Sequence, residues 1–202
     1  MKPKLTYFDA PASRGEECRL ALHIAGVDFE DHRVKSADWP NLKPTTPFGT
    51  MPYYEESGRP VLGQSNAILV YLGRTHGLHP TDTFAAAQHE ELMQYVEELR
   101  QRVSATLRMP PDEKQRVREE LAASYMPAWG ANVERHLADQ GPFVAGATLH
   151  VVDLKLYMIV RWFAKTTVDH IPATIFDGYP KLVRLYEAVA AHPGVVSWSA
   201  RS

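Results

Sequence analysis

The feature that most constrains the fold is a proline-marked segment between Trp39 and Leu72. Within it, Met51-Pro52 comes directly before a short aromatic run that extends to Glu55. A proline cannot donate a hydrogen bond to a strand ladder, so inside a sheet it is tolerated at the first residue of a strand. We therefore expect a strand that begins at Pro52 and leaves the backbone of Met51 available to bind another molecule.

A turn and a helix follow this strand. Residues 56–59 (Glu-Ser-Gly-Arg) have the composition of a hairpin turn. The apolar residues of 68–72 then fall on one helical face, which makes Ser65, just after Gln64, the expected N-cap. A helix N-terminus presents unpaired N–H groups and a positive dipole end, which favour a carboxylate or phosphate. Together with the backbone of Met51, this anion seat fits a small peptide with a free carboxylate.

Composition narrows the class of protein. With 202 residues, 45% hydrophobic and 23% charged, the chain has the balance of a globular protein with one large or two small domains. A net charge of -2 argues against nucleic acid as a partner. No apolar run approaches the roughly 20 residues of a membrane helix, so no membrane is expected. A single cysteine, Cys18, excludes an intrachain disulfide and favours a reducing cytoplasm. No histidine pair has convincing ligand spacing, so no metal is expected.

The first 75 residues read as a small sheet with helices on its faces. A β-prone run at 4–8 is followed by a helical pattern from Arg14 to Ala25 that Gly26 ends, and by a second strand at 27–34. The proline-marked segment then adds two strands and a helix. This order predicts an α/β domain over residues 1–75.

The rest of the chain carries no strand signal. We expect a linker at 76–83 and an all-helical domain over 84–202. Within that domain a helical stripe contains Pro127, which should kink it, and one strongly apolar helix should be central and buried. The predicted helices are 84–107, a stripe at 117–137 whose helix starts at Asp112, the buried helix 149–164, and 181–191.

Several short segments together resemble one protein family over the whole chain. They are Lys4-Leu5-Thr6-Tyr7-Phe8, Phe29-Glu30-Asp31-His32-Arg33, Ala37-Asp38-Trp39-Pro40, Pro47-Phe48-Gly49 and Gln64-Ser65. In this combination the chain resembles the cytosolic glutathione transferases, most of all the sigma class, which includes the haematopoietic prostaglandin D synthases. The resemblance implies a thioredoxin-like N-terminal domain, an all-helical C-terminal domain, a homodimer, and glutathione as co-substrate.

The resemblance also implies roles for individual residues. Tyr7 supplies the hydroxyl beside the glutathione sulfur. Met51, before a cis Pro52, pairs its backbone with the cysteinyl residue of glutathione, and Gln64 and Ser65 hold its γ-glutamyl end. The other implied contacts are Arg14 near the sulfur, Trp39 and Lys43 at the glycine end, Thr50 among the glutathione-binding residues, and Glu97 and Glu98 as an acidic pair that reaches the neighbouring subunit's site.

The chemistry of the thiol supports the role of Tyr7 independently. A thiolate, not a thiol, attacks an electrophile, and a free thiol has a pKa near 8.5. Lowering that pKa by about two units takes roughly 2.7 kcal/mol, which is about the size of a charge-assisted hydrogen bond from a tyrosine hydroxyl. Glutathione brings its own nucleophile, so the protein needs no catalytic Cys or His. Ser13 is a rival hydroxyl, because some transferase classes use a serine just after the first strand.

The sequence therefore predicts a glutathione transferase that conjugates glutathione to small hydrophobic electrophiles. The electrophile pocket is expected to include Phe8, Ser13, Leu107 and Met109, with Trp198 of the C-terminal tail as a further candidate. One alternative is a glutathione-dependent isomerase of prostaglandin type, although residues 104–107 lack the aromatic residue that this subfamily carries there. Another is a non-catalytic, crystallin-like binding protein, against which the presence of Tyr7, Pro52, Gln64 and Ser65 argues.

Overall fold

The computed structural model describes residues 2–201 and divides into two compact units. One unit contains the residues up to Ala86 together with those from His192 onwards, and the other is Ala87–Ala191. The expected order, an α/β domain followed by a helical domain, is the order that the structure has. The expected limits of 1–75 and 84–202 differ from these units mainly at the C-terminus, where the last helix packs with the N-terminal elements.

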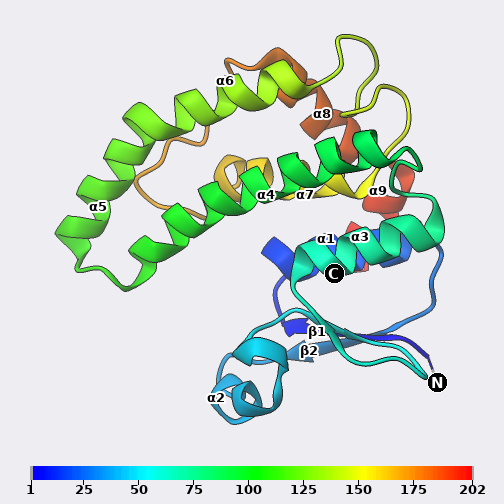
Figure 1. The fold of residues 1–202 in the computed structure, drawn as a ribbon. Coiled ribbons are helices and arrows are strands. Elements are labelled where there is room, and N and C mark those ends of the chain that lie inside the picture. The colour runs from blue at the N-terminus through cyan, green and yellow to red at the C-terminus, as the bar shows by residue number, and fades with distance from the viewer. Residues whose placement is uncertain (1, 202) are drawn as a thin grey trace. The chain divides into compact units, whose positions relative to one another are not determined.

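The N-terminal unit is a four-stranded sheet with the strand order β2-β1-β3-β4. Strand β1 runs parallel to β2 and antiparallel to β3, and β3 pairs antiparallel with β4. Helices α1 and α3 cover one face, and α2 lies on the opposite side of the sheet (Figure 1). The elements are β1 (Lys4–Phe8), α1 (Ser13–Ile24), β2 (Glu30–Val34), α2 (Trp39–Leu42), β3 (Tyr53–Glu55), β4 (Leu62–Gly63) and α3 (Ser65–His76).

The core of this unit lies between the sheet and the two helices. Leu5 on β1 faces Tyr54 on β3 in the ladder, and both side chains are buried. The apolar stripe of α3, Ile68, Leu69 and Leu72, is fully buried, as its helical spacing predicts. The second strand is shorter than the expected 27–34, because residues 27–29 are irregular after the turn at Ala25 and Gly26, and pairing with β1 begins only at Glu30.

The last helix, α9 (Pro193–Ser199), packs against α1. The indole N–H of Trp198 donates to the carboxylate of Glu16 at 2.8 Å, and its ring stacks on Phe29 with the centroids 6.0 Å apart. Trp198 is only 7% exposed. The expectation that Trp198 lines an electrophile pocket is therefore wrong, because its ring and its N–H are both used in packing α9 onto the N-terminal unit.

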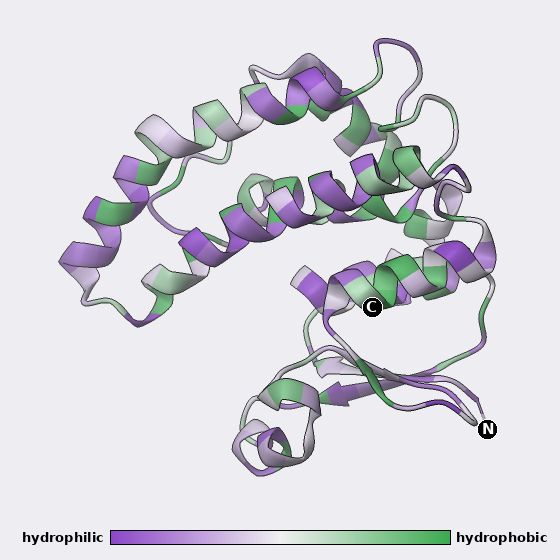
Figure 2. Ribbon diagram, viewed as in Figure 1, coloured by the Kyte–Doolittle hydropathy of each residue, from purple (hydrophilic) through white to green (hydrophobic). Residues whose placement is uncertain are grey.

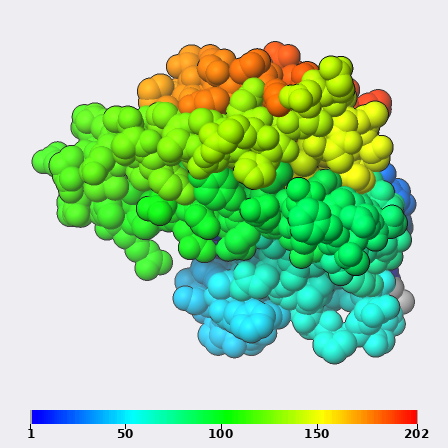
Figure 3. Space-filling view, turned by 45° about the horizontal axis from the view of Figure 1, so that its top comes forward, coloured from blue at the N-terminus to red at the C-terminus, as the bar shows by residue number. Residues whose placement is uncertain are grey.

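The C-terminal unit is helical. Hydrophilic and hydrophobic residues are mixed along α4, as expected for an amphipathic helix, whereas α5 is almost entirely hydrophilic (Figure 2). Helix α7 is buried over most of its length, as predicted, and α8 packs against α6 and α7, with its contact to α6 visible in Figure 3. The helices are α4 (Thr83–Ala105), α5 (Pro111–Glu120), α6 (Met126–His136), α7 (Val151–Ala164) and α8 (Pro180–Ala191).

The expected irregularity at Pro127 takes the form of a π-helical turn, Leu121–Tyr125, between α5 and α6. A proline lacks the N–H for an i→i−4 bond, and its ring clashes with the carbonyl of that residue. The wider turn just before Pro127 accommodates both effects without ending the helical path. Helix α5 starts at Pro111, one residue before the expected Asp112, and the first helical turn is where proline is tolerated.

Asp153 holds the start of α7. Its carboxylate accepts hydrogen bonds from the backbone N–H groups of His150 at 2.7 Å and Val144 at 2.8 Å. The side chain is fully buried, and this burial raises the pKa of Asp153 to about 7 although the backbone donors lower it. When the pKa of an acid is higher in the folded protein than in the unfolded chain, the folded protein loses stability as that acid ionises.

We predict that Asp153→Asn changes how stability depends on pH. In the wild type, the contribution of Asp153 should fall as the pH rises from about 4 to about 7, by up to roughly 4 kcal/mol. The asparagine side chain does not ionise, so the free energy of unfolding of the wild type should decrease relative to that of the variant across the same pH range. Urea unfolding of both proteins between pH 4 and 8 measures the difference. A difference that grows with pH would show instead that the two N–H donors hold the ionised carboxylate.

Candidate functional site

Three pieces of the N-terminal unit meet at one edge of the sheet. Thr6 near the end of β1 lies opposite Tyr53 at the start of β3, and Tyr53 lies opposite Gly63 at the end of β4. This register brings the carboxyl end of β1, the residues before β3 and the residues after β4 to the same place. Tyr7, Met51-Pro52 and Gln64-Ser65 therefore lie in the same part of the sheet, although they are far apart in the sequence.

Tyr7 lies on β1 with its ring packed between its neighbours. It is 8% exposed, and its ring meets that of Phe8 edge-on with the centroids 5.5 Å apart. Phe8 in turn meets Trp39 of α2 edge-on at 5.6 Å. The sequence predicted that these three residues share a site, and these ring contacts bring them together.

The Tyr7 ring also lies directly against the first turn of α1. A Cβ atom placed on Gly15 would be 2.0 Å from Cδ1 of Tyr7 and 2.6 Å from its Cβ. Only a residue without a side chain fits at this position, so Gly15 determines how closely the ring approaches the helix. Gly15 could not be identified from the sequence, because a glycine in a helical pattern looks the same whether or not another side chain packs closely against it.

A second tyrosine near this edge serves the core instead. Tyr54 on β3 is 4% exposed and packs against Tyr71 of α3 with the ring centroids 6.1 Å apart. Burial raises the pKa of Tyr54 to about 12, with Glu56 adding to the shift. Tyr54 is therefore protonated at neutral pH and enclosed in the core of the N-terminal unit.

The Met51-Pro52 peptide bond is cis, as predicted. Pairing of β3 begins at Tyr53, so the amide and carbonyl of Met51 lie outside the ladder. Pro52 is buried and Met51 is half-buried. Thr50 has an exposed side chain whose hydroxyl donates to the carbonyl of Pro47 at 3.4 Å.

The start of α3 differs from the prediction by one residue. The N-cap is Gln64, whose carbonyl accepts the first helical bond from Ile68 at 3.0 Å, and Ser65 is the first helical residue. The expectation that Ser65 is the N-cap is therefore wrong. The reason is that the chain turns from β4 into the helix at Gln64, which has a positive φ of 67°. Such a conformation is uncommon for a residue other than glycine and often occurs at functional sites.

Ser65 still lies where an anion can bind. It is 5% exposed in the first turn of α3, where the first N–H groups have no partner within the helix. The side chain of Gln64 is exposed. The predicted anion seat is therefore compatible with the observed helix start, with Ser65 offering its hydroxyl from the first position rather than from the cap.

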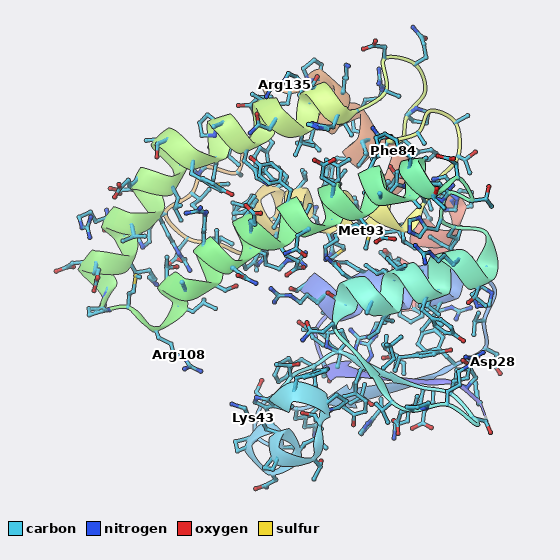
Figure 4. The ribbon with its side chains drawn as sticks, in the orientation of Figure 1. Asp28, Lys43, Phe84, Met93, Arg108 and Arg135 are labelled. Carbon is cyan, nitrogen blue, oxygen red and sulfur yellow. The ribbon has the colours of Figure 1, made fainter. Side chains whose placement is uncertain are left out.

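The remaining candidates of this unit surround the same edge. Ser13 is the first residue of α1 and has a positive φ of 62°, and Arg14 follows it half-buried. Lys43 is exposed in the segment after α2 (Figure 4), and its Cε would lie 3.6 Å from a Cβ placed on Gly49.

The other candidates lie in the helical part of the chain. Leu107 is 65% exposed and Met109 is half-buried, both just after α4. Glu97 is 8% exposed, and its carboxylate accepts from Lys155 at 2.6 Å and from Arg100 at 2.7 Å. Glu98 is exposed. Of the acidic pair, therefore, Glu97 already has two cationic partners in its own chain, and the cross-subunit role stays a prediction.

Residues 2–201 contain no cluster of three or more His, Cys, Asp or Glu side chains that could hold a metal ion. Within the same range, no helix is both long and apolar enough to cross a membrane.

Two family models match this chain. A model described as "Glutathione S-transferase, N-terminal domain" matches residues 3–74, and one described as "Glutathione S-transferase, C-terminal domain" matches residues 97–202.

Individual proteins agree with these models. Glutathione S-transferase 1 of Ascaris suum is 34% identical, with 98% of this chain and 95% of that protein covered. Hematopoietic prostaglandin D synthase of Gallus gallus is 31% identical, with 96% and 94% covered. The structure of monomeric Na-GST-3, a glutathione S-transferase of Necator americanus, superposes with a TM-score of 0.86 at 26% identity, with 100% and 97% covered. The chain belongs to the glutathione S-transferase family, and it is a transferase that uses glutathione as co-substrate.

We predict that Gly15→Ala displaces the ring of Tyr7. The added methyl group would overlap the ring, so stability should fall by about 1–3 kcal/mol and conjugation of glutathione should slow. Urea unfolding and near-ultraviolet circular dichroism measure the two structural effects. Gly178→Ala is the matched control, because no atom lies within 4 Å of a Cβ at that position. Equal behaviour of the two variants would contradict the tight contact.

Proposed function

We propose that glutathione binds along the edge formed by β1, β3 and β4, and that its thiolate attacks small hydrophobic electrophiles. The observation that carries this proposal is the register of the three strands, which gathers Tyr7, Met51-Pro52 and Ser65 at one edge. The family model that matches residues 3–74 supports the choice of this unit for glutathione.

In this proposal the tripeptide is held at three points. The backbone of Met51, outside the ladder, pairs with the cysteinyl residue like an added strand. The first turn of α3 receives the γ-glutamyl carboxylate at Ser65, with Gln64 beside it. Trp39 and Lys43 face the glycine end, where the charge of Lys43 suits the second carboxylate. Thr50 completes the binding residues.

Tyr7 is the residue proposed for the chemical step. Its hydroxyl donates a hydrogen bond to the sulfur, and this bond is stronger to a thiolate than to a thiol. The ionised form is therefore favoured at neutral pH, and the sulfur forms a bond to the electrophile while a leaving group such as a halide departs. Arg14 at the start of α1 adds positive charge near the sulfur. Ser13 remains the rival hydroxyl, since it is the first residue of α1 and comes directly after the loop that follows β1.

Conjugation is favoured over prostaglandin-type isomerisation by the end of α4. The resemblance to the isomerases requires an aromatic residue there, but Thr106 is fully buried and its hydroxyl accepts from Arg118 at 2.6 Å. Leu107 instead presents an exposed apolar side chain, which suits a small hydrophobic electrophile, and the half-buried Met109 lies close to it in the chain. Turnover of a generic aromatic halide with glutathione tests this activity, and a protein that binds glutathione without turnover would be a non-catalytic homologue.

We further propose a sigma-class homodimer that works in the cytoplasm. The similarity to a hematopoietic prostaglandin D synthase supports the class, and the single, buried cysteine supports a reducing compartment. The exposed Glu98 is the better candidate for a contact with the neighbouring subunit's glutathione. One similar structure is described as monomeric, so light scattering at micromolar concentration is the direct measurement, and a monomer would remove both the dimer and the contact.

We predict that Tyr7→Phe lowers turnover with little change in glutathione affinity. The ring and its packing remain, but the donor to the sulfur is lost. Turnover at neutral pH should fall ten- to a hundredfold, roughly 1.4–2.7 kcal/mol, and the remaining rate should rise at higher pH than in the wild type. Ser13→Ala should do much less. If Ser13→Ala abolishes turnover and Tyr7→Phe keeps the rate and its pH profile, the hydroxyl belongs to Ser13.

We also predict that Ser65→Ala weakens glutathione binding and leaves the chemical step almost unchanged. Losing one hydrogen bond to a carboxylate costs roughly 1.5–3 kcal/mol, so the KM for glutathione should rise tenfold or more while kcat changes little. Steady-state kinetics with glutathione varied at saturating electrophile separate the two constants. Thr45→Ala, which changes an exposed hydroxyl bonded to the carbonyl of Leu42, is the control. An unchanged KM would refute the assignment of Ser65.

A further inference from the structure

Arg19 is a fully buried cation in the middle of α1, and its guanidinium lies near the ring of Tyr7, the proposed catalytic residue. It has no exposed surface, and its Cζ lies 5.8 Å from the centroid of the Tyr7 ring. A helical residue of this kind normally extends its charged end to water. A buried guanidinium is costly unless its N–H groups are satisfied, so the partners of Arg19 show what the side chain holds.

Two of these partners are carbonyl groups of the chain that carries Tyr7. The Arg19 side chain donates to the carbonyl of Phe8 at 3.0 Å and to the carbonyl of Ala10, also at 3.0 Å. These carbonyls lie one and three residues after Tyr7, where β1 ends and the loop to α1 begins. The planar guanidinium can hold both at once, because its donors point in fixed, diverging directions.

Two carboxylates fix the guanidinium itself. Asp31 on β2 accepts from Nε at 2.8 Å, and Glu16 accepts from Nη1 at 3.2 Å. Asp31 also binds Arg33 at 2.7 Å, and Glu16 also accepts from Trp198 of α9. The position of Arg19 is therefore set by β2 and by the C-terminal helix, and Arg19 in turn sets the position of the loop after Tyr7.

We propose that Arg19 is a positioning residue for the Tyr7 hydroxyl. It clamps the carbonyls of Phe8 and Ala10 and borders one side of the Tyr7 ring, while Gly15 lets α1 approach the ring closely. This inference rests on the proposed role of Tyr7. A shift of the hydroxyl by about 1 Å weakens its bond to the sulfur and can cost on the order of a hundredfold in rate, so the geometry that Arg19 sets controls thiolate formation without any contact with glutathione.

The test is a double-mutant cycle between Arg19→Lys and Tyr7→Phe. Lysine keeps the positive charge but lacks the planar set of donors of the guanidinium, so it can hold only some of the four partners. At neutral pH, with a generic aromatic halide, Arg19→Lys should lower kcat about tenfold, move the rate profile to higher pH, and change the KM for glutathione by less than about twofold. In the Tyr7→Phe background the same change should cause almost no further loss, because the hydroxyl it positions is gone.

Arg184→Lys is the matched control, since Arg184 also holds a loop carbonyl, that of Ala138 at 2.8 Å, but lies in the helical unit. It should leave kcat and the pH profile unchanged. If Arg19→Lys does not fold, Asp31→Asn loosens the same guanidinium from a partly exposed position and should move the profile in the same direction.

Three results would overturn the proposal. The first is an unchanged pH profile in a folded Arg19→Lys or Asp31→Asn variant. The second is an equal loss of kcat from Arg19→Lys in the presence and absence of the Tyr7 hydroxyl. The third is a loss of kcat from Arg184→Lys as large as that from Arg19→Lys. If Tyr7→Phe alone has no effect, the proposed role of Tyr7 fails, and the positioning role of Arg19 fails with it. A normal response to Tyr7→Phe without any response at Arg19 overturns the positioning role alone.

Discussion

The candidate site depends on the hydrogen-bond pairing of β3 with its two neighbours. Because β3 is short and antiparallel to both β1 and β4, its first residue lies opposite Thr6 of β1 and Gly63 at the end of β4. A shift of one residue would turn Tyr54 from the core to the other face and separate Pro52 from the start of α3. The buried pair Leu5 and Tyr54 opposes such a shift. The packing of the core and the geometry of the site are therefore set by the same ladder.

The sequence was most informative where local chemistry decides the structure. Proline at the start of a strand predicted the free edge at Met51, and apolar spacing predicted the buried stripe of α3 and the buried helix α7. Gly26 was correctly placed at the end of α1, where its φ of 69° requires glycine. These features depend on neighbours in the chain, so a pattern of residue types is sufficient to find them.

The features that the sequence did not indicate depend on partners far away along the chain. The ion pair between Glu97 and Lys155, 58 residues later, is one of them. Trp198 looks like a free apolar residue of a tail until Glu16, 182 residues earlier, accepts its N–H. Arg19 was not singled out from the sequence, because its partners lie on β1, on β2 and in the loop after β1. The N-cap was placed one residue late, because the unusual backbone of Gln64 has no signature in its residue type.

The central claim is that glutathione lies along the β1, β3 and β4 edge with its sulfur at Tyr7. A crystal structure of the protein with bound glutathione tests it most directly. We predict that the cysteinyl backbone pairs with Met51, that the γ-glutamyl carboxylate lies at the first turn of α3, and that the sulfur lies within hydrogen-bond distance of the Tyr7 hydroxyl. A sulfur bonded to Ser13 instead, or a tripeptide bound away from Met51 and Ser65, would contradict it.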